Sequence, residues 1–147
     1  MLRCPARSAV LATFAVLASL TGIAGADEKV LSPREARALE GKEVTVEATV
    51  QAAGKYKRGT AEHHFWLVNA KLPKTFTQDT VYVAIPVTEA KKFGQEDLDK
   101  LQFELFQKYH EKTIRVRGTV RLEKDEDGKE SRVRIDVKDP NQITIET

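Results

Sequence analysis

Cysteine, histidine and tryptophan are scarce in this chain. Its 147 residues include one cysteine, three histidines and one tryptophan. Because Cys4 precedes an apolar run near the amino terminus, we expect the folded part to be stable without disulfides and to have no thiol nucleophile. His63 and His64 are neighbours, and neighbours in a strand point to opposite faces, so they cannot bind one metal ion together. We therefore expect no metal site.

Sequence motifs of common catalytic sites are also lacking. The chain has no Gly-x-Ser-x-Gly nucleophile elbow, no phosphate-binding glycine loop, and no histidine with an obvious nucleophile beside it. Carboxylates are abundant, but their number alone does not create a catalytic geometry. We therefore expect a protein that is not an enzyme and that needs no cofactor.

The longest apolar run is too short to favour a retained membrane span. Two arginines precede the run over residues 9–23, which is rich in Ala, Ser and Thr, and small residues follow it at 24–26. A membrane-spanning helix needs about 20 predominantly apolar residues, whereas this layout is typical of a secretory signal peptide. We expect residues 1–26 to be a signal peptide, cleaved near Ala26. Residues 27–147 would then be a single exported domain, periplasmic or extracellular.

An excess of either charge is missing as well. The chain carries 24 Lys and Arg and 22 Asp and Glu. Because residues 1–26 contain two of the arginines and no acidic residue, residues 27–147 hold 22 residues of each sign. A polyanion-binding protein usually has an excess of Lys and Arg. The simplest electrostatic argument for a nucleic-acid partner is therefore absent.

Several runs do show the alternation or the composition of β-strands. Apolar and polar residues alternate, or β-branched and aromatic residues gather, in five segments. These segments are residues 43–51, 63–68, 80–86, 112–122 and 132–145. The glycine-flanked basic segment 54–59 predicts a loop between the first two strands, and the acidic segment 123–130 predicts a hairpin tip between the last two.

Two other segments have helical patterns. Residues 32–41 begin with a capping box and a proline at the first helical position, which predicts a short helix at the amino-terminal end. Between the third and fourth strands, apolar residues recur at three- and four-residue spacing. They are Leu98, Leu101, Leu105, Phe106 and Tyr109, and Phe103 lies off this stripe.

The order of these elements predicts a mainly β fold with accessory helices. Three strands, one long helix and two strands follow one another, which is the order of the OB-fold, a five-stranded Greek-key barrel. We therefore expect such a barrel, with the long helix between strands three and four. A sandwich with a peripheral helix is less favoured because the strands are too few.

Some of these segments resemble a known family. They are residues 65–69, 81–85, 90–93, 112–120 and the ending Asp139-Pro140-Asn141-Gln142-Ile143. They are similar to bacterial OB-fold modules of the nucleic-acid-binding type, some exported alone and some fused to secreted nucleases. The resemblance covers residues 43–145 and implies a nucleic-acid-binding module. The chain differs from these modules at Glu111, where they usually carry glycine, and in its long acidic tip.

Three groups of residues are candidates for ligand binding. In OB-folds the ligand groove crosses strands two and three, between the loop joining strands one and two and the loop joining strands four and five. The first of these loops carries Lys55, Tyr56, Lys57 and Arg58. Trp66 and Tyr82 could stack a base or a sugar if alternation places both on the outer face. The last group is a basic stripe of Arg115, Arg117, Arg121, Arg132 and Arg134.

Each group also has a structural interpretation. Charged tips are often only solvated, and large aromatic residues more often pack than bind. The arginines can pair across strands with carboxylates, namely Glu43, Glu47, Glu123 and Asp136.

Two functional hypotheses follow from these candidates. The first is weak binding of single-stranded nucleic acid or another extended polymer, with an affinity that falls steeply with salt and drops on Trp66→Ala. The second is interaction with a protein or glycan of the cell envelope. Exposure of Trp66 and Tyr82 on one face favours the first hypothesis, and burial of both favours the second.

Overall fold

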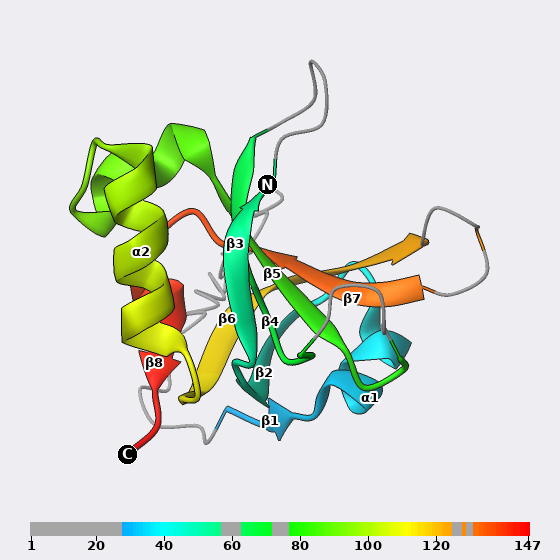
Figure 1. The fold of residues 1–147 in the computed structure, drawn as a ribbon. Helices are drawn as coiled ribbons and strands as arrows, with labels where there is room; N and C mark the ends of the chain where they lie inside the picture. Colours follow the sequence, from blue (N-terminus) through cyan, green and yellow to red (C-terminus); the bar gives the residue numbers. More distant parts are fainter. Residues whose placement is uncertain (1–27, 57–62, 72–76, 125–127, 129–130) are drawn as a thin grey trace, which may run out of the picture.

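The computed structural model describes residues 28–56, 63–71, 77–124, 128 and 131–147 (Figure 1). Its elements are β1 (Val30–Leu31), α1 (Pro33–Ala36), η1 (Arg37–Leu39), β2 (Glu43–Thr49), β3 (Ala52–Tyr56), β4 (His64–Val68), β5 (Val81–Pro86), η2 (Val87–Phe93), α2 (Leu98–Tyr109), β6 (Thr113–Lys124), β7 (Ser131–Asp136), η3 (Pro140–Gln142) and β8 (Ile143–Ile145). The predicted signal peptide, residues 1–26, lies outside the described residues. No helix in the described ranges is long and apolar enough to cross a membrane.

The strands form one mixed sheet. Their order is β1-β2-β6-β7-β5-β4-β3, and β8 pairs with β6 off this path. The pairs β1–β2 and β5–β7 are parallel, and the other pairs are antiparallel. Figure 1 shows α2 on one side of this sheet and the long β6–β7 hairpin reaching away on the other side.

A bend in the chain at Val50 and Gln51 joins β3, at one end of the strand path, to β2, the second strand from the other end. The Val50 N–H donates to the Lys112 carbonyl beside β6 at 2.9 Å. The next N–H, that of Gln51, donates to the Val68 carbonyl at the end of β4 at 2.8 Å. Strands β2 and β3 therefore act as one bent strand that pairs with β6 and then with β4, which makes the sheet compatible with an OB-like barrel.

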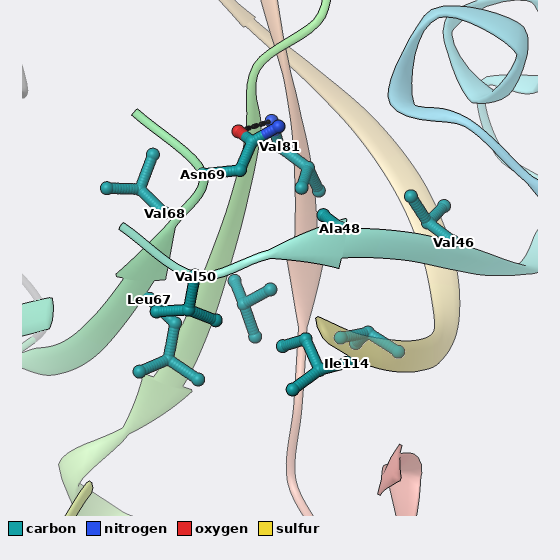
Figure 2. A pocket seen from close by; sticks show the side chains of 10 residues that line it. Val46, Ala48, Val50, Leu67, Val68, Asn69, Val81 and Ile114 are labelled. Carbon is teal, nitrogen blue, oxygen red and sulfur yellow. Dashed lines mark hydrogen bonds between the residues drawn. The ribbon is translucent and has the colours of Figure 1, made fainter. Parts of the chain in front are cut away.

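The interior of the barrel is filled by alternating apolar side chains. Phe65, Leu67, Val83 and Ile85 belong to the core cluster, and α2 adds Leu101, Leu105 and Tyr109 to it. A small cavity of about 10 Å³ lies among such side chains, and Figure 2 shows the residues that line it. At its edge the Asn69 side chain accepts a hydrogen bond from the Val81 N–H at 2.9 Å. A cavity of this size holds one water molecule at most, so it has no room for a base or a sugar.

The predicted order of elements is confirmed, but the number of strands and the helix positions differ. The described sheet has eight strands instead of five, because the first predicted strand continues beyond its bend as β3, β1 joins the edge, and η3 separates β7 from β8. The amino-terminal helix has the predicted capping box at Ser32 but turns into η1 after Ala36. The helical region before β6 is divided into η2 and α2 near Gly94, whose φ is 91°.

Two further sequence predictions need correction. Residues 54–56 were expected in a loop but belong to β3, where Gly54 pairs with Trp66 of β4. Phe106 was expected on the buried face of α2 and is 39% exposed, whereas Phe103, off the stripe as predicted, is 60% exposed. The stripe is narrower than expected because α2 lies against the barrel through Leu101, Leu105 and Tyr109.

Candidate functional site

Trp66 and Tyr82 lie on the same outer face of the barrel. Alternation along β4 points Phe65 and Leu67 into the core and sends Trp66 outwards. On β5 the same rule sends Tyr82 outwards, between the core residues Val81 and Val83. The two outer rings are stacked, with centroids 6.3 Å apart and ring planes 25° apart. Of the two registers that the sequence allowed, the structure has the one that places both rings on the same outer face.

Tyr82 is covered by its neighbours although it points away from the core. Its side chain is only 5% exposed. The hydroxyl lies 2.7 Å from Nε2 of His64, and the Arg132 guanidinium carbon lies 4.0 Å from the ring centroid. Other side chains therefore already cover the Tyr82 ring. Trp66 is half-buried and is the more accessible ring of the two.

Gly54 makes room for the Trp66 ring. The two residues are register partners in the β3–β4 pair. A Cβ atom added to Gly54 would lie 2.5 Å from Cζ2 of Trp66, closer than real Cβ contacts. The indole therefore lies directly over the β3 backbone, which fixes its position on the face.

A chain of ion pairs continues this face across β7 and β6. Arg132 donates to Glu123 at 3.0 Å, and Arg134 donates to the other oxygen of Glu123. Arg134 also donates to Asp136 at 2.8 Å, and Arg121 donates to the second Asp136 oxygen at 2.6 Å. We call Arg132, Glu123, Arg134, Asp136 and Arg121 the ion-pair chain. Its three arginines and two carboxylates leave one uncompensated positive charge.

The electrostatic environment keeps the ion-pair chain charged. Burial alone would raise the pKa of Glu123, but hydrogen bonds and charge from Arg134 and Arg132 outweigh it and lower that pKa. The Asp136 pKa is lowered in the same way, with burial opposed by hydrogen bonds from Arg121 and Arg134. Burial would lower the pKa of Arg134, yet its two carboxylate partners raise it. Glu123, Asp136 and Arg134 are therefore ionised near neutral pH.

The predicted basic stripe is not one continuous cationic surface. Arg115 pairs with Glu47 at 3.0 Å and with Glu146 at 3.2 Å. Arg117 pairs with Glu43 at 2.7 Å and with Glu28 at 3.5 Å. Together with the ion-pair chain, these contacts confirm the cross-strand pairing with Glu43, Glu47, Glu123 and Asp136 that the sequence offered as the structural interpretation.

The structure covers only part of the two segments predicted to border the ligand groove, the basic segment 54–59 and the acidic tip 123–130. Lys57 and Arg58 lie outside the described residues, as does the Tyr56 side chain. Lys55 is described, and its Nζ lies 2.7 Å from Oδ1 of Asp99 on α2. In the acidic tip, residues 125–127 and 129–130 lie outside the described residues. Within the described part of the chain, no three His, Cys, Asp or Glu side chains are grouped to hold a metal ion.

Comparisons with known proteins yield similar structures of low identity, among them two aspartyl-tRNA synthetases. No protein-family model and no curated protein matches the chain. An aspartyl-tRNA synthetase from Entamoeba histolytica is 22% identical, with a TM-score of 0.44 over 80% of this chain and 21% of that chain. A provisionally assigned aspartyl-tRNA synthetase from Leishmania major Friedlin is 16% identical, with a TM-score of 0.43 over 86% of this chain and 22% of that chain. The chain thus spans about a fifth of the length of either structure, and similarity at this level identifies neither a family nor a ligand.

Proposed function

We propose that this protein is an exported, non-enzymatic OB-fold module that binds single-stranded nucleic acid weakly. The five barrel strands would be β2 with β3, β4, β5, β6 and β7, and a base would stack on Trp66. The observation that supports this function best is the stack of Trp66 on Tyr82, with Arg132 over the Tyr82 ring. Stacking of a base on an aromatic side chain contributes about 1–3 kcal/mol and tolerates any base.

The charge of this face sets the expected strength of binding. Single-stranded ligands gain affinity when cationic side chains neutralise their phosphates and release counterions. Here each arginine of the ion-pair chain already contacts a carboxylate. One uncompensated positive charge corresponds to a slope of about −0.7 in a plot of log binding constant against log salt concentration. This slope is much shallower than that of proteins with many phosphate contacts. Stacking on Trp66 would therefore provide most of the affinity.

Titration with oligonucleotides tests this function directly. Trp66 is the only tryptophan, so its fluorescence reports the proposed site without a label. Short oligothymidines at low salt should quench its emission. With a labelled oligonucleotide, Trp66→Ala should weaken binding about 5- to 150-fold, the equivalent of one lost stack. Phe103→Ala, which removes another exposed ring, should leave binding unchanged, and a wild-type protein that binds no oligonucleotide would refute the function.

A glycan or protein of the cell envelope is a second candidate ligand. It is favoured by the pairing of arginines with carboxylates, because a neutral ligand with hydroxyl groups can donate to Asp136 or Glu123 and accept from their arginine partners. Aromatic rings such as Trp66 also stack on the apolar faces of sugars. Quenching of Trp66 by neutral oligosaccharides, or capture of an envelope component that is lost in Trp66→Ala, would support this ligand if oligonucleotides do not bind.

A further inference from the structure

A polar groove of about 580 Å³ lies beside the ion-pair chain. Its lining comes from β6, from the start of β2 and from the segment that leads from β7 into η3. The residues that matter here are Arg117, Gly118, Arg121, Asp136, Lys138 and Gln142. Two of them, Arg121 and Asp136, are also the last pair of the ion-pair chain. The groove is therefore continuous with the face that carries Trp66.

The walls of this groove are held by specific contacts. A Cβ atom on Gly118 would lie 2.5 Å from Cγ2 of Ile135, so β6 can pass this close to β7 only with glycine there. The Gln142 side chain donates to the Arg117 carbonyl at 2.9 Å and accepts from the Lys138 N–H at 2.8 Å. Gln142 thereby ties η3 to both walls. The groove is a formed feature of the fold that does not depend on a ligand.

Alternation along β7 leads from Tyr82 into the groove. Arg132, Arg134 and Asp136 point outwards, and Val137 belongs to the core and continues the pairing by donating to the Ala84 carbonyl at 2.8 Å. The next outward residue is Lys138, in the groove wall. Six residues of strand span about 20 Å. A row of three cations, interrupted by Asp136, therefore extends about 20 Å from the aromatic stack to the groove.

The pairing register gives the shorter path across the sheet. Trp66 pairs with Ala84, and Ala84 pairs with Asp136. Two strand spacings amount to about 10 Å, so Asp136 at the edge of the groove lies about that far from Trp66. The residue between them, Ala84, is fully buried, so a ligand on this path passes over the side chains that cover it. A strand of a few nucleotides can therefore reach from Trp66 to the groove.

The cations of the groove differ in how far they are neutralised. Arg117 contacts two carboxylates, those of Glu43 and Glu28. Arg121 contacts Asp136, whose charge it shares with Arg134. Lys138 is exposed, and no carboxylate in the described ranges forms an ion pair with it. Lys138 is therefore the groove cation with most of its charge available to an anionic ligand.

We propose that this groove is a phosphate-binding subsite of the nucleic-acid interface. A strand with one base on Trp66 crosses β5 and β7 and places a later phosphate between Lys138 and Arg121. The Arg121 side chain is 58% exposed, so its guanidinium can donate to phosphate while it keeps its ion pair with Asp136. Lys138 adds a point charge. This inference rests on the proposed function, because it requires that the ligand be single-stranded nucleic acid.

A comparison of short and long oligonucleotides tests the subsite. Binding of labelled oligothymidines of two and eight nucleotides is measured across a salt series for wild type, Lys138→Gln and Lys112→Gln. Lys112 is an exposed lysine outside the groove, so its variant loses the same formal charge. Lys138→Gln should weaken binding of the eight-nucleotide strand and reduce its salt slope by about 0.7, the value of one phosphate contact. It should leave the dinucleotide unchanged, and Lys112→Gln should change neither.

The failure of this inference is distinct from failure of the proposed function. If Trp66→Ala weakens both oligonucleotides while Lys138→Gln behaves like Lys112→Gln, nucleic acid binds at Trp66 but does not use the groove. If Lys138→Gln weakens the dinucleotide as much as the longer strand, the groove is not a separate subsite. If the wild-type protein binds neither oligonucleotide, the proposed function is wrong, and the subsite with it.

Discussion

Nε2 of His64 and the hydroxyl of Tyr82 lie 2.7 Å apart on the outer face of the barrel. Their rings meet edge to face, with centroids 5.7 Å apart. This contact joins β4 to β5 in addition to the backbone pairing of the two strands. It also holds Tyr82 beside Trp66, so that the exposed ring is supported by a buried one. We therefore expect Tyr82 to position Trp66 and not to contact a ligand.

Removal of the Tyr82 hydroxyl should destabilise the fold without abolishing binding. Tyr82→Phe loses a buried hydrogen bond, which typically costs about 1–2 kcal/mol. Urea unfolding, followed by the fluorescence of Trp66, measures this loss. Since the ring beside Trp66 remains, oligonucleotide affinity should change less than it does in Trp66→Ala. Unchanged stability together with strongly reduced affinity would show that the hydroxyl contacts the ligand directly.

A methyl group at Gly54 should displace the Trp66 ring. The added Cβ would lie 2.5 Å from the indole in the present structure, so the ring must shift or β3 must move. Overpacking of this kind costs about 1–3 kcal/mol. Gly54→Ala should therefore lower the free energy of unfolding and shift the emission maximum of Trp66.

The Gly54 effect has an internal control. In a Trp66→Leu background the clash is largely removed, so Gly54→Ala should lower the free energy of unfolding clearly less there. Urea unfolding followed by circular dichroism would measure this free energy in both backgrounds. Equal costs in both backgrounds would locate the penalty in the backbone of β3 and would contradict the packing explanation.

The ion-pair chain should make stability depend on pH in the acid range. The pKa values of Glu123 and Asp136 are lowered in the folded state. Their unfolded values are about 4.3 and 3.9, so the stabilisation is present above that range and is lost as pH falls through the folded values. Unfolding free energies measured from pH 6 downwards should therefore decline below about pH 5. The Glu123→Gln variant cannot titrate at this position, so its unfolding free energy should decline less steeply with falling pH. A decline parallel to that of the wild type would show that Glu123 does not cause the pH dependence.

The sequence predicted more of the fold than of the candidate site. Alternation predicted most strands and the outward direction of Trp66 and Tyr82, because period two depends only on which face is buried. It could not predict that His64 and Arg132 cover Tyr82, since that contact joins three strands. Gly54 was assigned to a loop because glycine disfavours strands in isolation, whereas here a tertiary contact with Trp66 requires it.

Lys138 is the candidate residue that sequence reasoning missed. The alternation that places Arg132, Arg134 and Asp136 on one face continues to Lys138, so the pattern contained the necessary information. The predicted strand over residues 132–145 also includes Lys138. Whether such a residue lies in a groove depends on η3 and its tie through Gln142, and neither follows from a local pattern.

Removal of one carboxylate from the ion-pair chain should separate the two candidate ligand classes. Glu123→Gln leaves Arg132 and Arg134 without the charge that both contact, so the face gains positive potential. A nucleic-acid ligand should then bind more tightly at low salt, with a salt slope steeper by about 0.7, whereas a neutral glycan should bind no better. Glu47→Gln is the matched control, because it removes the same charge from the partner of Arg115, outside the ion-pair chain. Anisotropy titrations of the two variants would measure the difference, and equal gains in both would mean that only net charge matters, and not the charge beside Trp66.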